Sequence, residues 1–496
     1  MAALSELLAK GKRVEAHRPV PRAMLDANTW MEAAHALADE RMTLLTLWGE
    51  REAAHMAARD AESGAIAVFS FACPNGHFPS VGAVHLPAVR LERTMRDLHG
   101  LVAVGAKDAR AWLDHGKWPH SRAEACAPYD FLSAAGEGLH RIVVGPVHAG
   151  IIEPGNFRFT AGGETVVRLE ERLGYVHKGI EGLMVGADLQ RGVQLAGRTS
   201  GDSTVAYAFA FARAAEAALE CEAPPRAVWL RALMAELERL ANHFGDIGAI
   251  CNDAAFALMH AHTGVLRERA LRASEAAFGH RLMRDCIVPG GVAHDLDDQG
   301  SAAIRAMIAE ARRRFPPLVK LYDDTTSLQD RTVGTGYLKP RLARQYGAGG
   351  FVGRASARDF DVRRDLVYAP YDRMRFVVPK RSDGDVNARV WVRIHEVEQS
   401  LDLIEQILAS LPTGPLRTTL PIGEEAGEGL ALVEGFRGDV LVWLRLNADG
   451  TIARCHLRDP SWFQWPLLEA AIEGNIVADF PLCNKSFNCS YSGHDL

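Results

Sequence analysis

The sequence predicts an α+β protein built from a small N-terminal α+β domain, residues 20–135, and a large mainly helical domain, residues 142–496, flanked by small antiparallel β sheets. Three observations lead to this prediction. Helix-like and strand-like segments are mixed before residue 135. Apolar residues recur at helical spacing through the middle of the chain. Short strand-like segments bounded by turn residues stand at 142–170 and 432–458.

The N-terminal part is predicted to contain two helices, at 33–47 and 91–101, and a strand at 65–72 with the sequence AIAVFSFA. Segment 90–119 is expected to continue after its amphipathic helix with a loop and a second short helix that ends at Trp118 and Pro119. A linker around 126–133 (CAPYDFLS) follows.

The second part begins with strands around 142–170 that meet across the glycine-rich turn Ala161, Gly162 and Gly163, which is typical of a hairpin. Near the end, 439–446 and 451–457 predict another hairpin around an Asp-Gly turn.

Between these strands the chain is predicted to be mostly helical. Helices are expected at 226–248 and 390–411, where apolar residues recur every three or four positions. The first helix would pack through its leucine stripe. Its other stripe, Glu236, Arg239 and His243, is interpreted as a solvated or partner-facing edge.

Composition places the chain among soluble globular proteins: 48% of its 496 residues are hydrophobic, 24% are charged, and the net charge is -6. This charge gives no general attraction to nucleic acid. Eight scattered cysteines without any C-x-x-C pair predict a reducing cytoplasm. The longest apolar run, 205–219, is broken by Arg213 and Glu216, so no membrane span is expected, and partner chains would hold the protein at a membrane.

Two small, polar, turn-like segments attract attention as a candidate site: 195–207 (LAGRTSGDSTVAY) and the tail 481–496 (PLCNKSFNCSYSGHDL). A buried soft-metal centre needs thiolates, usually in C-x-x-C pairs, because two such cysteines can point at one ion. Neither segment supplies a pair, and composition alone also allows both to be ordinary loops.

Seven stretches along the chain carry a family resemblance. They are GPVHAGIIEPGNFRF (145–159), RLGYVHKGIEGL (172–183), RALMAELERLANHFGDIG (231–248), VPGGVAHDL (288–296), DRTVGTGYL (330–338), VYAPYD (367–372) and WVRIHEVEQSLDLIEQIL (391–408). Taken together and in order, they resemble the large subunits of membrane-bound NiFe-hydrogenases of the formate hydrogenlyase type and the quinone-side large subunit of respiratory complex I. Segment 90–119 is similar to the small complex I subunit that is fused ahead of the large one in formate hydrogenlyase. The resemblance covers nearly the whole chain.

In the hydrogenases, two C-x-x-C pairs hold nickel and iron. The resemblance places Ser200 and Ser203 at the first pair, or Ala196 and Thr199 in an alternative register. At the second pair it places Ser490 and Gly493, with Cys489 one residue out of step. A serine hydroxyl stays protonated near pH 7 and is a hard ligand, and glycine has no side chain, so no nickel–iron centre is predicted.

The resemblance also implies catalytic residues. Glu153 occupies the position of a proton-relaying glutamate, and His148 that of one histidine at the quinone end of complex I, whose second histidine is not found. From the residues alone, His148 only braces a turn and Glu153 caps one. Arg198 and Asp202 are expected either to form an ion pair across the emptied site or to be surface residues.

A new metal site of Cys483, Cys489 and His494 is rejected because its spacing forms no compact ligand pair.

The function implied by the resemblance is that of a core subunit of a membrane-associated oxidoreductase complex, without its own NiFe centre. Electrons would come from a 4Fe-4S cluster on a partner small subunit and pass to a quinone-like acceptor with proton movement. The chain would bind no cofactor tightly and would lie on the inner face of the membrane through membrane-arm subunits. Two alternatives stay open: a catalytically silent coupling subunit, and a true hydrogenase with unusual ligands.

Overall fold

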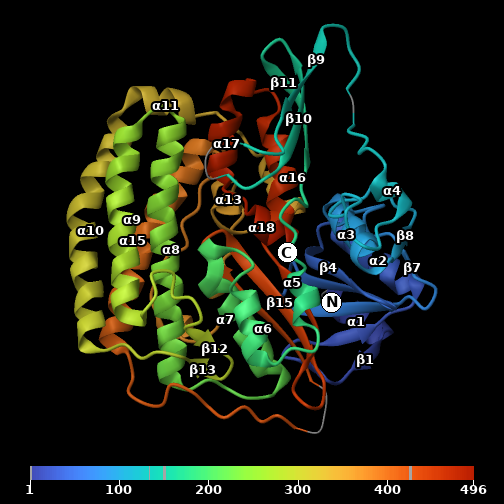
Figure 1. The fold of residues 1–496 in the computed structure, drawn as a ribbon, viewed down its shortest axis with the longest axis horizontal. Helices are drawn as coiled ribbons and strands as arrows, with labels where there is room; N and C mark the ends of the chain where they lie inside the picture. Colours follow the sequence, from blue (N-terminus) through green and yellow to red (C-terminus); the bar gives the residue numbers. More distant parts are fainter. Residues whose placement is uncertain (1–2, 133, 149–151, 424–426) are drawn as a thin grey trace.

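The computed structural model describes residues 3–132, 134–148, 152–423 and 427–496. A helical bundle forms one side of the molecule and an N-terminal α+β part forms the other, with long strands between them (Figure 1). The mixture of helices and several small sheets confirms the predicted α+β class.

The N-terminal part contains a five-stranded sheet with the order β1-β3-β6-β5-β4. Three helices contact this sheet. The strands are β1 (Lys12–Val14), β3 (Arg22–Met24), β4 (Met42–Glu50), β5 (Ala53–Asp60) and β6 (Ile66–Ala72), and the helices are α1 (Ala3–Lys10), α2 (Ala27–Ala38) and α3 (Val89–His99). A parallel pair, β7 (His77–Pro79) and β8 (Val102–Val104), lies beside the short segments η1 (Leu86–Ala88) and α4 (Ala123–Cys126).

Two predicted helices of this part are corrected. The helix predicted at 33–47 ends at Ala38, and Met42 already begins β4, which pairs with β5. The helix expected to end at Trp118 and Pro119 does not form in that segment. The reason is that the Asp97 carboxylate accepts hydrogen bonds from three successive backbone N–H groups, those of residues 112–114, and so holds them outside a helical pattern.

The N-terminal residues also complete a sheet of the second part. Strand β2 (His17–Arg18) pairs in parallel with β14 (Glu428–Gly435) at the edge of a sheet with the order β16-β15-β14-β2. Close by, Arg22 forms a buried ion pair with Glu428. The division at 135–142 stays a prediction, but packing and hydrogen bonding cross it.

The strands of the second part confirm both predicted hairpins. β10 pairs with β11 across Gly162, and β15 pairs with β16. The sheet β11-β10-β9 projects from the top of the molecule in Figure 1. The strands are β9 (Leu139–Val144), β10 (Asn156–Gly162), β11 (Thr165–Arg172), β12 (Ile287–Val288), β13 (Gly291–Val292), β15 (Gly438–Leu446) and β16 (Ile452–Arg458).

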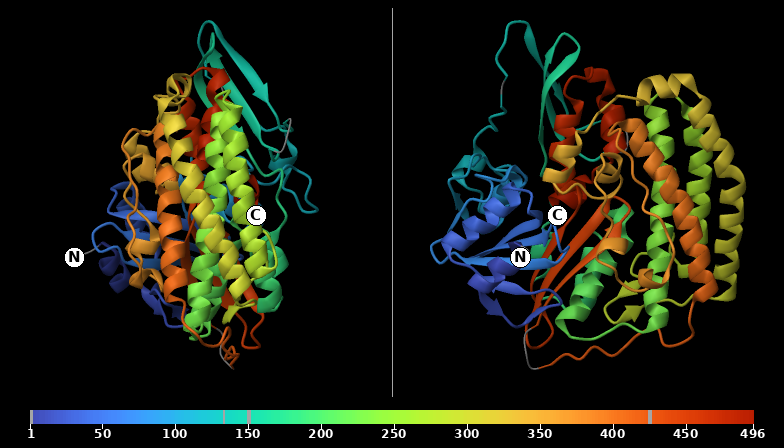
Figure 2. Two further views of the ribbon diagram at one scale, coloured as in Figure 1. Left: turned by 90° about the vertical axis from the view of Figure 1, so that its left-hand side faces the viewer. Right: turned by 180° about the vertical axis from the view of Figure 1, so that it is seen from behind.

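Four long helices, α8, α9, α10 and α15, form the bundle, and they lie side by side in both views of Figure 2. Their bounds confirm the long helices predicted around 226–248 and 390–411. They are α8 (Pro225–Asp253), α9 (Ala257–Phe278), α10 (Asp298–Asp324) and α15 (Val386–Ser410). No helix of the described residues is both long and apolar enough to cross a membrane.

Shorter helices connect the bundle to the sheets. They are α5 (Ile180–Met184), α6 (Leu189–Ala196), α7 (Thr204–Ala218), α11 (Thr326–Thr332), α12 (Pro340–Gln345), α13 (Gly350–Ala355), α14 (Val362–Asp365), α16 (Ser461–Ile472), α17 (Phe480–Phe487) and α18 (Tyr491–Asp495), with the 3-10 turns η2 (Gly201–Ser203), η3 (Tyr371–Arg373) and η4 (Val477–Asp479).

The polar stripe of α8 is buried, which corrects its interpretation as a solvated edge. Glu236, Arg239 and His243 are each at most 1% exposed. Their charges are satisfied from other elements: Arg363 binds Glu236 at 2.9 Å, and Glu396 of α15 contacts His243 at 2.6 Å. These partners lie more than 120 positions away in the sequence, so the spacing on α8 alone could not reveal them.

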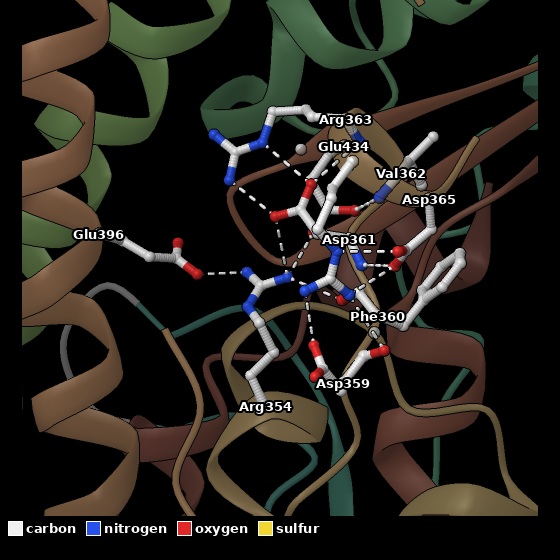
Figure 3. Close-up of polar contacts among 12 residues, drawn as sticks. Arg354, Asp359, Phe360, Asp361, Val362, Arg363, Asp365, Glu396 and Glu434 are labelled. Carbon is white, nitrogen blue, oxygen red and sulfur yellow. Dashed lines mark hydrogen bonds and ion pairs between the residues drawn. The ribbon is translucent and has the colours of Figure 1, made fainter. Parts of the chain in front are cut away.

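Arg354 lies at the centre of this buried ionic network (Figure 3). Its guanidinium group contacts Glu396 of α15, Glu434 of β14 at 2.9 Å and Asp361 at 3.3 Å. Because all four side chains are at most 1% exposed, each charge depends on the others for its neutralisation. The network therefore joins α15 of the bundle to β14 of the sheet β16-β15-β14-β2.

Candidate functional site

The two polar segments singled out in the sequence meet in the fold. Ser200 lies just before η2, and Ser490 caps the N-terminus of α18. Their hydroxyl oxygens are 2.9 Å apart, and both residues are 4% exposed. Residues separated by 290 positions thus form one wall of the candidate site.

The hydroxyl groups form an oriented chain. Ser200 Oγ donates to Asp202 Oδ1 at 2.7 Å. Ser490 Oγ accepts from the Gly493 backbone N–H at 2.8 Å. Since the proton of Ser200 is directed to Asp202, Ser490 is the donor in the contact between the two serines. Both oxygens are therefore engaged in hydrogen bonds.

Asp202 pairs with Arg437, which corrects the predicted pair with Arg198. The Arg437 guanidinium group binds both carboxylate oxygens of Asp202, at 2.8 and 2.5 Å. Arg198 instead points toward Asp285 and binds it at 2.5 Å. Burial raises the pKa of Asp202, but the charge and hydrogen bonds of Arg437 outweigh it, so this pKa lies below its ordinary value.

The alternative expectation, that Arg198 and Asp202 are surface residues, agrees with part of the geometry. Their side chains are 37% and 36% exposed. Arg437, in contrast, is 5% exposed and lies in the turn between β14 and β15. Arg437 was not predicted from the sequence. Its position between two glycines in the turn of an apolar hairpin (GFRGD) is a sequence signal that could have indicated it.

The remaining two predicted ligand positions are occupied by other contacts. Ser203 Oγ accepts from Arg437 at 3.2 Å. At Gly493 an added Cβ would lie 2.5 Å from Asp459 Oδ2. Asp459 is itself fixed by the Tyr207 hydroxyl group, which donates to it at 2.7 Å. A carboxylate therefore fills the space beside Gly493 that a fourth thiol would need.

A cavity of about 350 Å³ opens beside the two serines. Glu153 is exposed at this cavity and accepts a hydrogen bond from the Ser492 backbone N–H at 3.2 Å. Basic and amide groups line the same space. The lining residues are Ile152, Glu153, Ser200, Gly201, Asp202, Arg437, Asn484, Lys485, Asn488, Cys489, Ser490, Tyr491 and Ser492.

His148 is not among the residues that line this cavity. Its Nε2 atom is hydrogen-bonded to the Gly155 carbonyl oxygen at 2.8 Å, and its ring packs near Phe157. These contacts are those of a residue that braces the turn between β9 and β10. Residues 149–151, within the stretch that carries the resemblance, lie outside the described part of the chain.

The donor set at the cavity does not fit a nickel–iron centre. The two serine oxygens are hydrogen-bonded, and Cys489 is the thiol at the wall. Burial raises the pKa of Cys489 well above its ordinary value, which disfavours the thiolate that soft metals bind. Within the described residues, no group of three or more His, Cys, Asp or Glu side chains is arranged to hold a metal ion.

In the rejected site Cys483, Cys489 and His494, the histidine is engaged by other residues. His494 contacts Asp495 at 2.9 Å, accepts from the Trp112 indole N–H at 3.2 Å and stacks on Trp462. These contacts occupy both nitrogen atoms of the His494 ring.

A second cavity, of about 130 Å³, lies on the other side of Asp202. Gly201 and Asp202 line both cavities, and Glu238 of α8 lines the second one. Glu238 accepts hydrogen bonds from the backbone N–H groups of Val205 and Ala206 at 2.7 and 3.1 Å, in the first turn of α7. Burial nevertheless raises the pKa of Glu238 to about 8.

Comparison with known proteins shows the family of the chain. Residues 254–421 match the family described as respiratory-chain NADH dehydrogenase, 49 Kd subunit. Formate hydrogenlyase subunit 5 of Escherichia coli (strain K12) is 30% identical over 439 residues, which cover 84% of this chain and 77% of the relative. Carbon monoxide-induced hydrogenase of Rhodospirillum rubrum is 31% identical over 350 residues, which cover 70% of this chain and 97% of the relative. The chain belongs to the family of the respiratory-chain NADH dehydrogenase 49 Kd subunit.

Two further matches concern the sequence and the fold, respectively. An NADH-quinone oxidoreductase subunit of Desulfotalea psychrophila (strain LSv54 / DSM 12343) is 32% identical over 343 residues, which cover 68% of this chain and 91% of the relative. A chain of the archaeal membrane-bound sulfane sulfur reductase shares the fold, with a TM-score of 0.68 and 24% sequence identity over 73% of this chain and 100% of that one. The 49 Kd family therefore includes relatives named as hydrogenases and relatives named as quinone oxidoreductases.

Proposed function

We propose that this member of the 49 Kd family is a core subunit of a membrane-associated oxidoreductase complex, in which it passes electrons from a partner iron–sulfur subunit to a quinone-like acceptor. The relatives named as formate hydrogenlyase and NADH-quinone oxidoreductase subunits support the subunit role. Attachment to the inner face of the membrane through membrane-arm subunits belongs to the same proposal.

The observation that carries the proposal is the cavity beside Ser200 and Ser490. Serine hydroxyl groups line it at two of the positions where the hydrogenase resemblance places thiolates, and amide and guanidinium groups line the rest of the same space. Hydroxyl, amide and guanidinium groups bind carbonyl oxygen atoms well and bind nickel poorly. A carbonyl-bearing acceptor therefore suits this lining better than a nickel–iron centre does.

Reduction of a quinone consumes two electrons and two protons, so the site must deliver protons as well as bind the ring. Glu153 is exposed to solvent at the cavity and is held by Ser492, so it can exchange protons with water and transfer them into the cavity. Arg437 and Lys485 place positive charge where negative charge develops on the acceptor oxygen atoms. Electrons arrive from a cluster on the partner subunit in this proposal.

Two experiments test the proposal on the purified complex. In the first, nickel and iron are quantified: a full equivalent of nickel per complex would instead support a hydrogenase with unusual ligands. In the second, quinone reduction is compared between the native complex and Glu153→Gln, which we expect to turn over about 100-fold more slowly because a positioned acid is lost.

The matched control is Glu164→Gln, at an exposed glutamate of the β10–β11 turn outside the cavity. Its turnover should equal that of the native complex. Equal turnover of Glu153→Gln and the native complex would favour the second candidate, a catalytically silent subunit that couples the peripheral and membrane arms.

A further inference from the structure

We propose that a second site, the cavity beside Arg172, binds a small organic carboxylate with an apolar body. This cavity has a volume of about 510 Å³ and lies between β11 and the segment that contains Pro128 and Tyr129. We call it the Arg172 cavity. It shares no lining residue with the cavity beside Ser200 and Ser490, so it is independent of the proposed redox function.

Arg172 is a buried cation without a carboxylate partner among the described residues. It is 3% exposed. Its terminal nitrogen atoms donate to two backbone carbonyl oxygens, those of Ala111 at 2.5 Å and Asp114 at 2.8 Å. Its Nε atom has no hydrogen-bond partner in the described part of the chain. Burying a charge is costly unless an opposite charge compensates it, so this guanidinium group favours an anionic ligand.

The neighbouring arginines already have partners. Arg93, Arg110 and Arg172 surround the Tyr129 ring, with guanidinium carbons 5.8, 4.9 and 4.1 Å from its centroid. Arg93 pairs with Asp108 at 3.1 Å, and Arg110 pairs with Asp108 at 2.6 Å and Glu170 at 2.8 Å. Asp108 and Glu170 therefore neutralise Arg93 and Arg110, whereas Arg172 forms an ion pair with neither carboxylate.

Among the described residues, Asp97, His115 and Asp130 are further titratable groups near the cavity, and none of them forms an ion pair with Arg172. Asp97 accepts three backbone N–H groups, and burial raises its pKa above the ordinary value. Burial lowers the pKa of His115, which is hydrogen-bonded to the Leu173 carbonyl. Asp130 is exposed at the cavity and adds negative charge there, which disfavours ligands with two negative charges. A monocarboxylate fits this balance better than a phosphate.

Arg96 also lines the cavity, and the other walls consist of small apolar side chains. The volume falls within the range of about 300–1,000 Å³ typical of small-molecule sites. The short side chains leave room for an apolar ligand body beside the Tyr129 ring. They are Ala109, Ala111, Ala125, Ala127 and Pro128.

The test measures binding of benzoate, with the neutral isostere benzamide for comparison, to the purified full-length protein by calorimetry. We expect saturable benzoate binding and at least about tenfold weaker benzamide binding, because a charge-assisted hydrogen bond contributes about 1.5–3 kcal/mol. Octanoate is measured in parallel: tighter binding of octanoate indicates a fatty acid as the natural ligand, and tighter binding of benzoate indicates a compact soluble acid.

Two variants locate the binding. Ala127→Trp fills the cavity from an exposed position and should abolish benzoate binding without loss of folding. Arg172→Met should weaken it about tenfold or more. Arg373→Met, at an arginine whose side chain is 73% exposed outside the cavity, is the matched control and should bind as the native protein does. Ala127→Trp keeps the test valid if Arg172→Met does not fold.

The proposal is overturned by any of three results: no saturable binding of either carboxylate, equal binding of benzoate and benzamide, or native affinity in Ala127→Trp. None of these results bears on quinone reduction at the other cavity.

Discussion

At the scale of single residues, the site depends on two serine hydroxyl groups that hydrogen-bond to each other. The resemblance to the hydrogenases assigns these positions to cysteine ligands. Ser490 donates to Ser200, and Ser200 donates to Asp202, whose charge is balanced by Arg437. Each serine hydroxyl group therefore accepts one hydrogen bond and donates another. Replacing one member therefore changes the hydrogen bonds of the next.

The contact between the two serines predicts a cross-link. Because their oxygens are 2.9 Å apart, Ser200→Cys combined with Ser490→Cys should form a disulfide on mild oxidation, detected by mass spectrometry as a linked peptide pair. The single variant Ser200→Cys is the control, since Cys489 lies next to Ser490. Absence of a link in the double variant would contradict the contact. A thiol at Gly493 is a poor addition, because its Cβ would lie 2.5 Å from Asp459 Oδ2.

At the scale of elements, α8 carries buried charge along its length instead of presenting a solvated edge. Glu236, Arg239 and His243 face partners on other elements, and Glu238 accepts hydrogen bonds from the backbone N–H groups at the start of α7. One helix thus organises both the ionic network and the second cavity.

Glu238 predicts a pH dependence of stability. Burial raises its pKa to about 8 from the ordinary value of 4.5, so between these values the folded protein keeps a proton that the unfolded chain has lost. This group therefore stabilises the fold most at low pH. Its contribution to the free energy of unfolding falls as pH rises from about 4.5 to about 8, by at most about 1.4 kcal/mol per pH unit.

Denaturant unfolding across this pH range checks the prediction. Glu238→Gln mimics the protonated form and should lose this part of the pH dependence. Glu310→Gln, at a glutamate whose side chain is 20% exposed and paired with Arg314, serves as the control. The hydrogen bond from Arg314 lowers the pKa of Glu310, so this group stabilises the fold more as pH rises through the acidic range. Glu310→Gln should therefore lose only that dependence of the free energy of unfolding at low pH and keep the decrease between about pH 4.5 and about pH 8. The same slope in Glu238→Gln and the native protein would show that Glu238 titrates normally.

At the scale of the whole molecule, buried ion pairs connect parts that are distant in the sequence. The Arg354 network joins α15 to β14 (Figure 3). The pair of Arg22 with Glu428 joins the N-terminal part to the same strand. The N-terminal and C-terminal parts are therefore expected to depend on each other for stability.

The Arg354 network predicts a large loss of stability on removal of its centre. Arg354→Met leaves Glu396, Glu434 and Asp361 buried without that cation, which should lower the free energy of unfolding by about 3–5 kcal/mol. Denaturant unfolding measures the change. The control Arg312→Met breaks pairs with Asp402 and Glu405 that are 41–50% exposed and should cost less than about 1 kcal/mol. Equal costs for the two variants would refute a structural role of the network.

The sequence by itself determined the α+β class, the long helices, both hairpins and the family. Each of these follows from local spacing or from motifs that are contiguous in the chain. The sequence also predicted Ser490 and, in one of two registers, Ser200 at positions that the resemblance assigns to thiolates, and this assignment stays a prediction. Only the tertiary structure decided that these serines touch, that Asp202 pairs with Arg437 rather than Arg198, and that the polar stripe of α8 is buried. The physical reason is that the partner of a charge or hydroxyl group is chosen by proximity in space. For these groups the partner lies more than a hundred positions away, where periodicity carries no information.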